Sequence, residues 1–401
     1  MRVRGAGGRR GLGPVVWLLG FASLANDVSS EAIFPLLPLF LAGLGGGIAY
    51  LGLVEGSADA LASLVKVVAG RYSDRGPRRL LVVGGYGLPA VARAALAAAV
   101  RPWNVLAARL VDRVGKGIRS GPRDALLADA AGPENRGRAF GVQRSMDHLG
   151  AAMGPLLASL LLALGASLRG TFAVAAGLGL LAPLLLALRL RDPREERGGA
   201  AAAARPDRGP LPGAFWRYLA LAGLFALGNS SDAFLLARAR EVGFEAAGLP
   251  LLWAGHHVIK ALTGAPGGAL SDRVPRRWVV AAGWLAFALA YAGFALARTE
   301  LEVALLFGFY AVYHGLAEPA ERALVADVAG PGARGRAFGW YHGVAGAASL
   351  PAGILTGVLW ERVGSRTALL TCAALAALAG LGLAAGPGLR HPAGTGAGRG
   401  A

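Results

Sequence analysis

Long apolar runs constrain this chain more than any other feature of its sequence. They include residues 14–21, 156–166, 172–190 and 367–385. Such runs are typical of helices that cross a lipid bilayer. Only 16% of the 401 residues are charged, against about 25% in soluble domains. These features exclude a disordered chain, a secreted disulfide scaffold and an ordinary soluble enzyme.

The apolar runs and the polar breaks between them predict an all-α, multi-pass membrane protein with twelve transmembrane helices. The spans must be helical, because lipid offers no partner for unpaired backbone groups. At about 1.5 Å per residue, each span can cross about 30 Å of hydrocarbon. The approximate limits are 14–42, 48–69, 80–100, 103–128, 139–164, 170–190, 214–237, 249–270, 278–297, 302–327, 338–360 and 367–386.

The net charge of +17 would suggest nucleic acid in a soluble protein. In a membrane protein, Lys and Arg gather instead in the cytoplasmic loops. Arginine is concentrated on one side of the predicted topology, in the N-terminal segment and in the loops near 71–79, 136–138, 189–217, 273–277 and 334–336. The charge therefore follows from topology, without nucleic acid. We expect both termini to be cytoplasmic and the chain to be a monomer in the cell (inner) membrane.

The two halves of the chain repeat each other. A polar linker at 191–213 separates residues 1–190 from residues 214–401. Ser73-Asp74-Arg75 recurs as Ser271-Asp272-Arg273, and the Arg-Gly-Arg-Ala-Phe-Gly sequence at 136–141 recurs at 334–339, both at a shift of 198 residues. A constant offset predicts two pseudo-symmetric six-helix bundles of parallel topology.

With these motifs the sequence resembles the major facilitator superfamily of secondary transporters over almost its full length. Residues 70–79 resemble the family's signature loop between helices 2 and 3, and 268–273 resemble its echo between helices 8 and 9. Arg109 stands where the family's helix 4 arginine would be. Residues 150–155 resemble the helix 5 motif of drug-exporting antiporters. The resemblance implies alternating access to a site between the halves, as in the proton-coupled drug and metabolite antiporters.

Three residues of the helix 5 motif have a direct physical role. Gly150, Gly154 and Pro155 permit close helix packing and a kink.

The fourth span is the most charged. It carries Arg109, Asp112, Arg113, Lys116, Arg119, Arg123 and Asp124. At 100° per residue these side chains form one broad stripe. By resemblance this helix lines the central cavity together with helices 1, 7 and 10. The stripe has five positive and two negative charges, so it can hold an anionic substrate, sense a proton on a neighbouring carboxylate, or form a structural ion-pair cluster.

The tenth span is the more acidic counterpart of the fourth. It carries His314, Glu318, Glu321 and Arg322. At the shift of 198, His314 corresponds to Lys116 and Glu321 to Arg123. We hypothesise that Arg119 and Arg123 pair with Glu318 and Glu321 when the cavity opens outward, which would form a gate between the halves.

Carboxylates in the first and seventh spans are candidates for proton coupling. Asp27 and Glu31 are four residues apart and share one helix face. Asp232 mirrors Glu31 in the second half. Buried carboxylates can load and release protons. Hydrogen bonding between helices and sodium binding are the alternatives.

The signature loops predict a mechanical role. We expect Asp74 and Asp272 each to begin a helix and to cap its free backbone amides. Arg75, Arg78 and Arg273 can then reach carboxylates or helix C-termini of a neighbouring bundle. This arrangement would couple cavity closure to loop packing.

The sequence favours a transporter over an enzyme. His-Glu-x-x-His, Gly-x-Ser-x-Gly and P-loop motifs are missing. The single Cys372 and the diverging pair His256-His257 give no metal site, and we expect no cofactor. We predict proton-coupled export of a small organic molecule. An importer of an anionic nutrient or metal chelate is the alternative, and an intramembrane lipid-modifying enzyme is a distant third.

The substitution Glu31→Gln tests the assignment of proton coupling to the first span. Glutamine cannot carry the proton, so substrate-driven proton movement into vesicles should be abolished when it is followed with a pH-sensitive dye. An unchanged pH dependence of transport would remove Glu31 from the coupling candidates.

Overall fold

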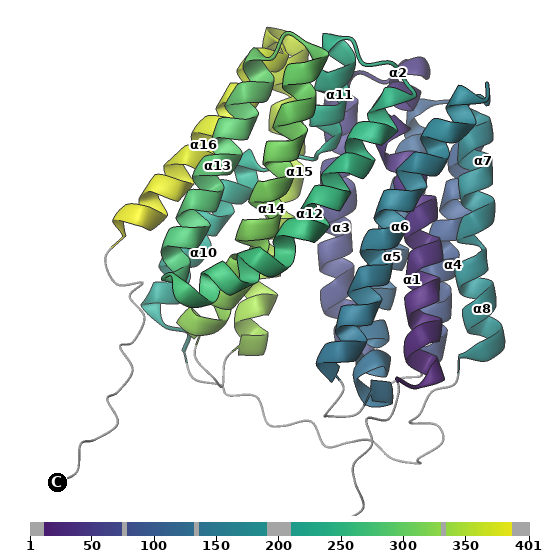
Figure 1. The fold of residues 1–401 in the computed structure, drawn as a ribbon, viewed down its shortest axis with the longest axis horizontal. Helices are drawn as coiled ribbons and strands as arrows, with labels where there is room; N and C mark the ends of the chain where they lie inside the picture. Colours follow the sequence, from purple (N-terminus) through teal and green to yellow (C-terminus); the bar gives the residue numbers. More distant parts are fainter. Residues whose placement is uncertain (1–11, 74–77, 132–135, 191–209, 330–333, 387–401) are drawn as a thin grey trace, which may run out of the picture.

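The computed structural model describes residues 12–73, 78–131, 136–190, 210–329 and 334–386. These residues form twelve helical passes (Figure 1). The prediction of an all-α, twelve-helix membrane fold is confirmed. The helices of the first half, α1 to α8, lie on one side of the molecule, and those of the second half, α10 to α16, lie on the other.

The first half contains six passes. They are α1 (Pro14–Ile33), η1 (Phe34–Leu36) and α2 (Leu37–Gly43) together, then α3 (Ile48–Ser73), α4 (Arg78–Ala97), α5 (Pro102–Ala131), α6 (Arg136–Ala163), and α7 (Leu168–Gly179) with α8 (Leu181–Arg189). The first pass changes to a 3-10 turn at Pro35, whose ring cannot donate a backbone hydrogen bond.

The second half contains the remaining passes. They are α10 (Gly213–Gly228) with α11 (Ala233–Val242), then α12 (Gly248–Arg273), α13 (Arg276–Leu296), α14 (Glu300–Ala329), α15 (Arg334–Val363) and α16 (Ser365–Ala385). The helix of the seventh pass is interrupted at 229–232.

Nine segments within the described ranges are long and apolar enough to cross a membrane. The passes outside that group are α5, α12 and α14. Each of these carries a charged side chain that faces the space between the halves, exemplified by Lys116, Lys260 and Glu318. Their lower hydropathy therefore reflects the polar surface that they present to the centre of the molecule.

The expectation that Asp272 begins a helix is wrong. Asp272 lies in the last turn of α12, which ends at Arg273, and α13 starts at Arg276 after Pro275. Proline disfavours helical geometry in the residue before it, and Val274 is extended. Pro275 thus sets the boundary between the two helices. Asp74 and Arg75 lie outside the described residues.

Close helix packing inside the first half depends on glycine. Gly150 and Gly154 of α6 lie against the backbone of α1, where a Cβ atom on Gly150 would come within 2.7 Å of the Leu24 carbonyl oxygen. Pro155 lies inside α6 just beyond them. These small residues let α1 and α6 pack along one another.

The two halves touch mainly through α3 with α15 and α6 with α12. At the first crossing, Gly52 and Gly56 of α3 face Gly353 of α15, and a Cβ atom on Gly353 would lie 3.1 Å from the Gly52 carbonyl carbon. At the second, the Ser159 hydroxyl donates to the Ala247 carbonyl oxygen at 2.8 Å. The contact is therefore closest where α3 and α12 begin, and the opposite end is left for a cavity.

The α3–α15 crossing predicts that alanine substitutions at two glycines of α15 have very different effects on stability. Gly353→Ala should destabilise the protein by about 1–3 kcal/mol through overpacking. Gly343→Ala meets no atom within 4 Å and should be neutral or stabilising, because alanine is the better helix former. Thermal unfolding of the purified variants in detergent measures both, and equal melting temperatures would contradict the crossing.

Candidate functional site

A cavity of about 1040 Å³ lies between the two halves. Its walls come from α1, α3, α4, α5 and α6 of the first half and from α12, α14 and α15 of the second. The contributing parts of α5 and α14 are near their ends, and those of α6 and α15 are near their beginnings. The cavity therefore opens on the side where α8 ends and α10 begins.

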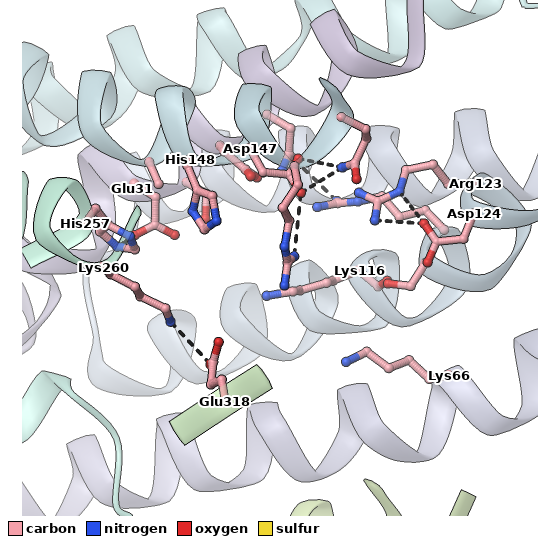
Figure 2. Close-up of a pocket in the computed structure, with 18 of the residues that line it drawn as sticks. Glu31, Lys66, Lys116, Arg123, Asp124, Asp147, His148, His257, Lys260 and Glu318 are labelled. Carbon is pink, nitrogen blue, oxygen red and sulfur yellow. Dashed lines mark hydrogen bonds and ion pairs between the residues drawn. The ribbon is translucent and has the colours of Figure 1, made fainter. Parts of the chain in front are cut away.

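The cavity wall is dominated by ionisable side chains (Figure 2). Its basic residues are Lys66, Arg93, Arg113, Lys116, Arg119, Arg123, Arg144, Lys260 and Arg322. Its acidic residues are Asp27, Glu31, Asp112, Asp124, Asp147 and Glu318, and its histidines are His148, His257, His314 and His342. With neutral histidines, nine positive charges face six negative ones, so the lining has a net positive charge.

Arg109 is not part of this lining. Its guanidinium donates from Nε and Nη2 to the two carboxylate oxygens of Glu55 on α3, both at 2.8 Å, and both side chains are buried. Arg113 lies 3.9 Å from the same carboxylate and 3.4 Å from Asp59. Of the roles considered for Arg109, this geometry matches the structural ion pair.

Arg93 on α4 is a central residue that the sequence analysis missed. Its guanidinium contacts Asp112 at 3.1 Å and donates to the Ser29 hydroxyl at 3.0 Å and to the side-chain oxygen of Asn26 at 3.1 Å. It thereby ties α4 to both α1 and α5. A lone arginine in the middle of an otherwise apolar span was the available signal.

The three candidate carboxylates have different surroundings. Asp27 lines the cavity and accepts from Asn26 Nδ2 at 2.8 Å, with no basic nitrogen within 4.0 Å among the described residues. Glu31 accepts from Trp253 Nε1 at 2.8 Å and so bridges the halves. Asp232 accepts from the Tyr310 hydroxyl at 2.6 Å inside the second half and does not line the cavity.

Three basic side chains face the cavity with no hydrogen bond or ion pair to any other described residue. They are Lys66 on α3, Lys116 on α5 and Arg322 on α14. Lys66 and Lys116 both point into the open space (Figure 2). Lys260, by contrast, is 3.3 Å from Glu318.

The hypothesised gate residues have partners in their own halves in this conformation. Arg119 lies over the Tyr86 ring at 4.4 Å, Arg123 is 3.0 Å from Asp124, Glu318 is 3.3 Å from Lys260, and Glu321 accepts from Trp284 Nε1 at 2.7 Å. The cavity is open on the side that this gate would close. Pairing across the halves therefore stays a prediction for the opposite conformation.

The arginines of the signature loops are only partly described. Arg78 is the first residue of α4 and is buried. Arg273 is the last residue of α12 and is exposed.

Comparison with known proteins identifies the family. The Major Facilitator Superfamily model matches residues 19–255 and 219–400. The chain is 30% identical over 380 residues to the uncharacterized MFS-type transporter MJ1317 of Methanocaldococcus jannaschii, covering 93% of this chain and 94% of that one. Multidrug resistance protein MdtH of Cronobacter sakazakii is 30% identical over 131 residues, 32% of this chain and 33% of that one. The chain belongs to the Major Facilitator Superfamily and is a secondary transporter.

Solved structures agree on the fold. The nucleoside transporter NupG (D323A mutant) superposes with a TM-score of 0.77 at 15% identity, covering 92% of this chain and 99% of that one. A bacterial homologue of the human lysosomal transporter Spinster, in an inward-facing and occupied conformation, superposes with a TM-score of 0.76 at 16% identity, covering 92% and 95%.

The buried Arg109–Glu55 pair predicts an asymmetric mutational response. Glu55→Gln leaves a buried guanidinium without its counter-charge and should destabilise the protein by about 3–5 kcal/mol. Asp59→Asn should have a small effect, because the Asp59 side chain is 49% exposed. Replacing Glu55 and Arg109 together with Leu and Met should restore most of the loss. Thermal melts compare the variants, and a milder effect of Glu55→Gln than of Asp59→Asn would contradict a structural pair.

Proposed function

We propose that this protein is a proton-coupled antiporter that exports a small, anionic organic molecule. The single observation that carries the substrate class is the set of unpaired cations Lys66, Lys116 and Arg322 in the cavity wall. They come from both halves of the molecule, so one bound anion can contact the two bundles at once. A neutral or cationic substrate would leave these charges uncompensated.

The electrostatics of the cavity support this substrate class. Hydrogen bonds between ammonium or guanidinium groups and carboxylate or phosphate oxygens are among the strongest in proteins. Two of the neighbouring acids are already paired, Asp112 with Arg93 and Glu318 with Lys260, and the lining still has more basic than acidic side chains. The excess positive charge therefore remains available to a ligand.

Asp27 supports proton coupling at the same cavity. Its carboxylate has a single hydrogen bond among the described residues, from Asn26, and faces the cavity. Asp147 on α6 lines the same cavity. A carboxylate without a cationic partner can exchange a proton with cavity water, and an anion bound nearby would compete with its charged form.

Two features support the export direction. Residues 150–155 carry the helix 5 motif. MdtH, to which the chain is similar over about a third of the length of each protein, is a multidrug resistance protein. The distribution of arginine orients the open side of the cavity toward the cytoplasm, where an exporter would take up its substrate.

Transport by proteoliposomes of the purified chain tests the proposal. Radiolabelled succinate and glycerol 3-phosphate are the probes, and the pH gradient is imposed in either direction. An antiporter accumulates a probe when the lumen is acidic, whatever its orientation in the membrane, because the proton leaves as the anion enters. Accumulation driven by an alkaline lumen would favour the alternative, an anion importer. Lack of any gradient-driven accumulation would overturn the proposal.

The unpaired cations predict a specific kinetic change. Lys66→Gln and Lys116→Gln should each raise KM for the transported anion about tenfold or more, because a hydrogen bond to a charged group contributes about 1.5–3 kcal/mol. The exposed Arg101 lies outside the cavity, so Arg101→Gln is the matched control and should leave KM unchanged. Unaltered KM in both lysine variants would contradict the anion site.

A further inference from the structure

A second chamber of about 240 Å³ lies beside the transport cavity, within the second half. Its walls come from α10, α13, α14 and α15. It shares His314, Glu318, Arg322 and His342 with the main cavity, so the two spaces adjoin at these residues. A ligand bound at these residues would therefore lie next to the chamber.

Aromatic rings form much of the chamber wall. Phe225, Trp284, Tyr313 and Tyr341 line it. Phe225 stacks on Trp284 with ring centroids 4.7 Å apart, and Tyr218 stacks behind Trp284 at 6.2 Å and behind Tyr341 at 6.4 Å. This stacking holds the rings of Phe225, Trp284 and Tyr341 in place beside the chamber.

The chamber also holds a buried carboxylate without a cationic partner. Glu321 is 8% exposed and accepts from Trp284 Nε1 at 2.7 Å and from the Tyr341 hydroxyl at 2.9 Å. No basic nitrogen lies within 4.0 Å of it among the described residues. Its nearest acidic neighbour along the helix, Glu318, is already paired with Lys260.

Arg322 lines both spaces and has to be considered as a competing cation. It lies at the junction of chamber and cavity, is exposed, and forms no ion pair with Glu321. In the proposed function it contributes to the anion site. An anionic group bound there would neutralise Arg322 and leave the charge of Glu321 to attract a cation.

We propose that the chamber binds an ammonium group, so that the transported molecule is a zwitterion with its anionic end on the Lys66, Lys116 and Arg322 side. Aromatic rings together with a carboxylate are groups that commonly recognise alkylated or protonated amines. Only the binding of the anionic end rests on the proposed function. The binding of the ammonium group rests on the chamber, whose walls all belong to the second half.

Isothermal titration calorimetry tests the assignment by measuring the binding of small probes to the purified full chain in lipid nanodiscs. The probes are choline, its neutral isostere 3,3-dimethylbutan-1-ol, glycine betaine and succinate. Choline should bind and the neutral isostere should not. Glycine betaine should bind at least tenfold more tightly than choline, because its carboxylate adds a contact with Arg322, which lines both spaces.

Two variants separate ligand binding from a structural role. Glu321→Gln should weaken choline binding at least tenfold, whereas Glu300→Gln, at an exposed position at the start of the same helix, should leave it unchanged. Trp284→Phe removes the indole N–H but keeps an aromatic wall, and should weaken choline less than Glu321→Gln does. The comparison of choline with its isostere on the unaltered protein needs no variant, so it remains decisive if Glu321→Gln fails to fold.

The outcomes distinguish this inference from the proposed function. Choline binding without succinate binding would keep the chamber and refute the anion site. Succinate binding without choline binding would keep the anion site and refute the chamber. Equal binding of choline and its neutral isostere would also overturn the chamber assignment. Unchanged choline affinity in Glu321→Gln would overturn it too, and would indicate that Glu321 is a structural or proton-binding group.

Discussion

The free-energy cost of a charge in hydrocarbon governs this structure. An ionised side chain at the centre of a bilayer costs several kcal/mol unless it is paired or hydrated. In the first half, buried ion pairs offset this cost: Arg109 pairs with Glu55, and Arg93 pairs with Asp112. Many of the remaining ionisable groups line a cavity between the halves. The helices can carry these charges only because glycine contacts, such as Gly52 with Gly353, hold the bundles together at one end and leave space at the other.

The internal repeat produces two similar scaffolds with different chemistry. At a shift of 198 residues, Lys116 corresponds to His314 and Arg123 to Glu321. The first half thus presents a basic wall, whereas the second presents aromatic rings around a carboxylate. A molecule held between such walls would touch both bundles, and its binding energy could favour one arrangement of the halves over another. This difference is the physical basis for coupling substrate binding to a change in access.

The fold was predictable because apolar run length and a constant repeat offset are properties of the sequence alone. The candidate site was predictable only in part. Lys116 lines the cavity, and a charge within a span is the sequence signal for such a position. Arg109 carries the same signal but faces Glu55, because the rotation of a helix depends on its packing. The side chamber depends on stacking between α10, α13 and α15, which no local pattern encodes. Asp272 was misplaced because Pro275, rather than the acidic residue, sets the helix boundary.

The central claim is that the halves move against each other around one polar cavity, and a pair of distances tests it most directly. Phe140 and Phe338 are related by the repeat and line the cavity on its open side. Spin labels at these positions, in a Cys372→Ala background, report its width by electron–electron double resonance. Labels at Gly43 and Arg362 report the opposite side. Addition of a transported anion should shorten the first distance and lengthen the second. A single, unchanged distance at both pairs would contradict the account.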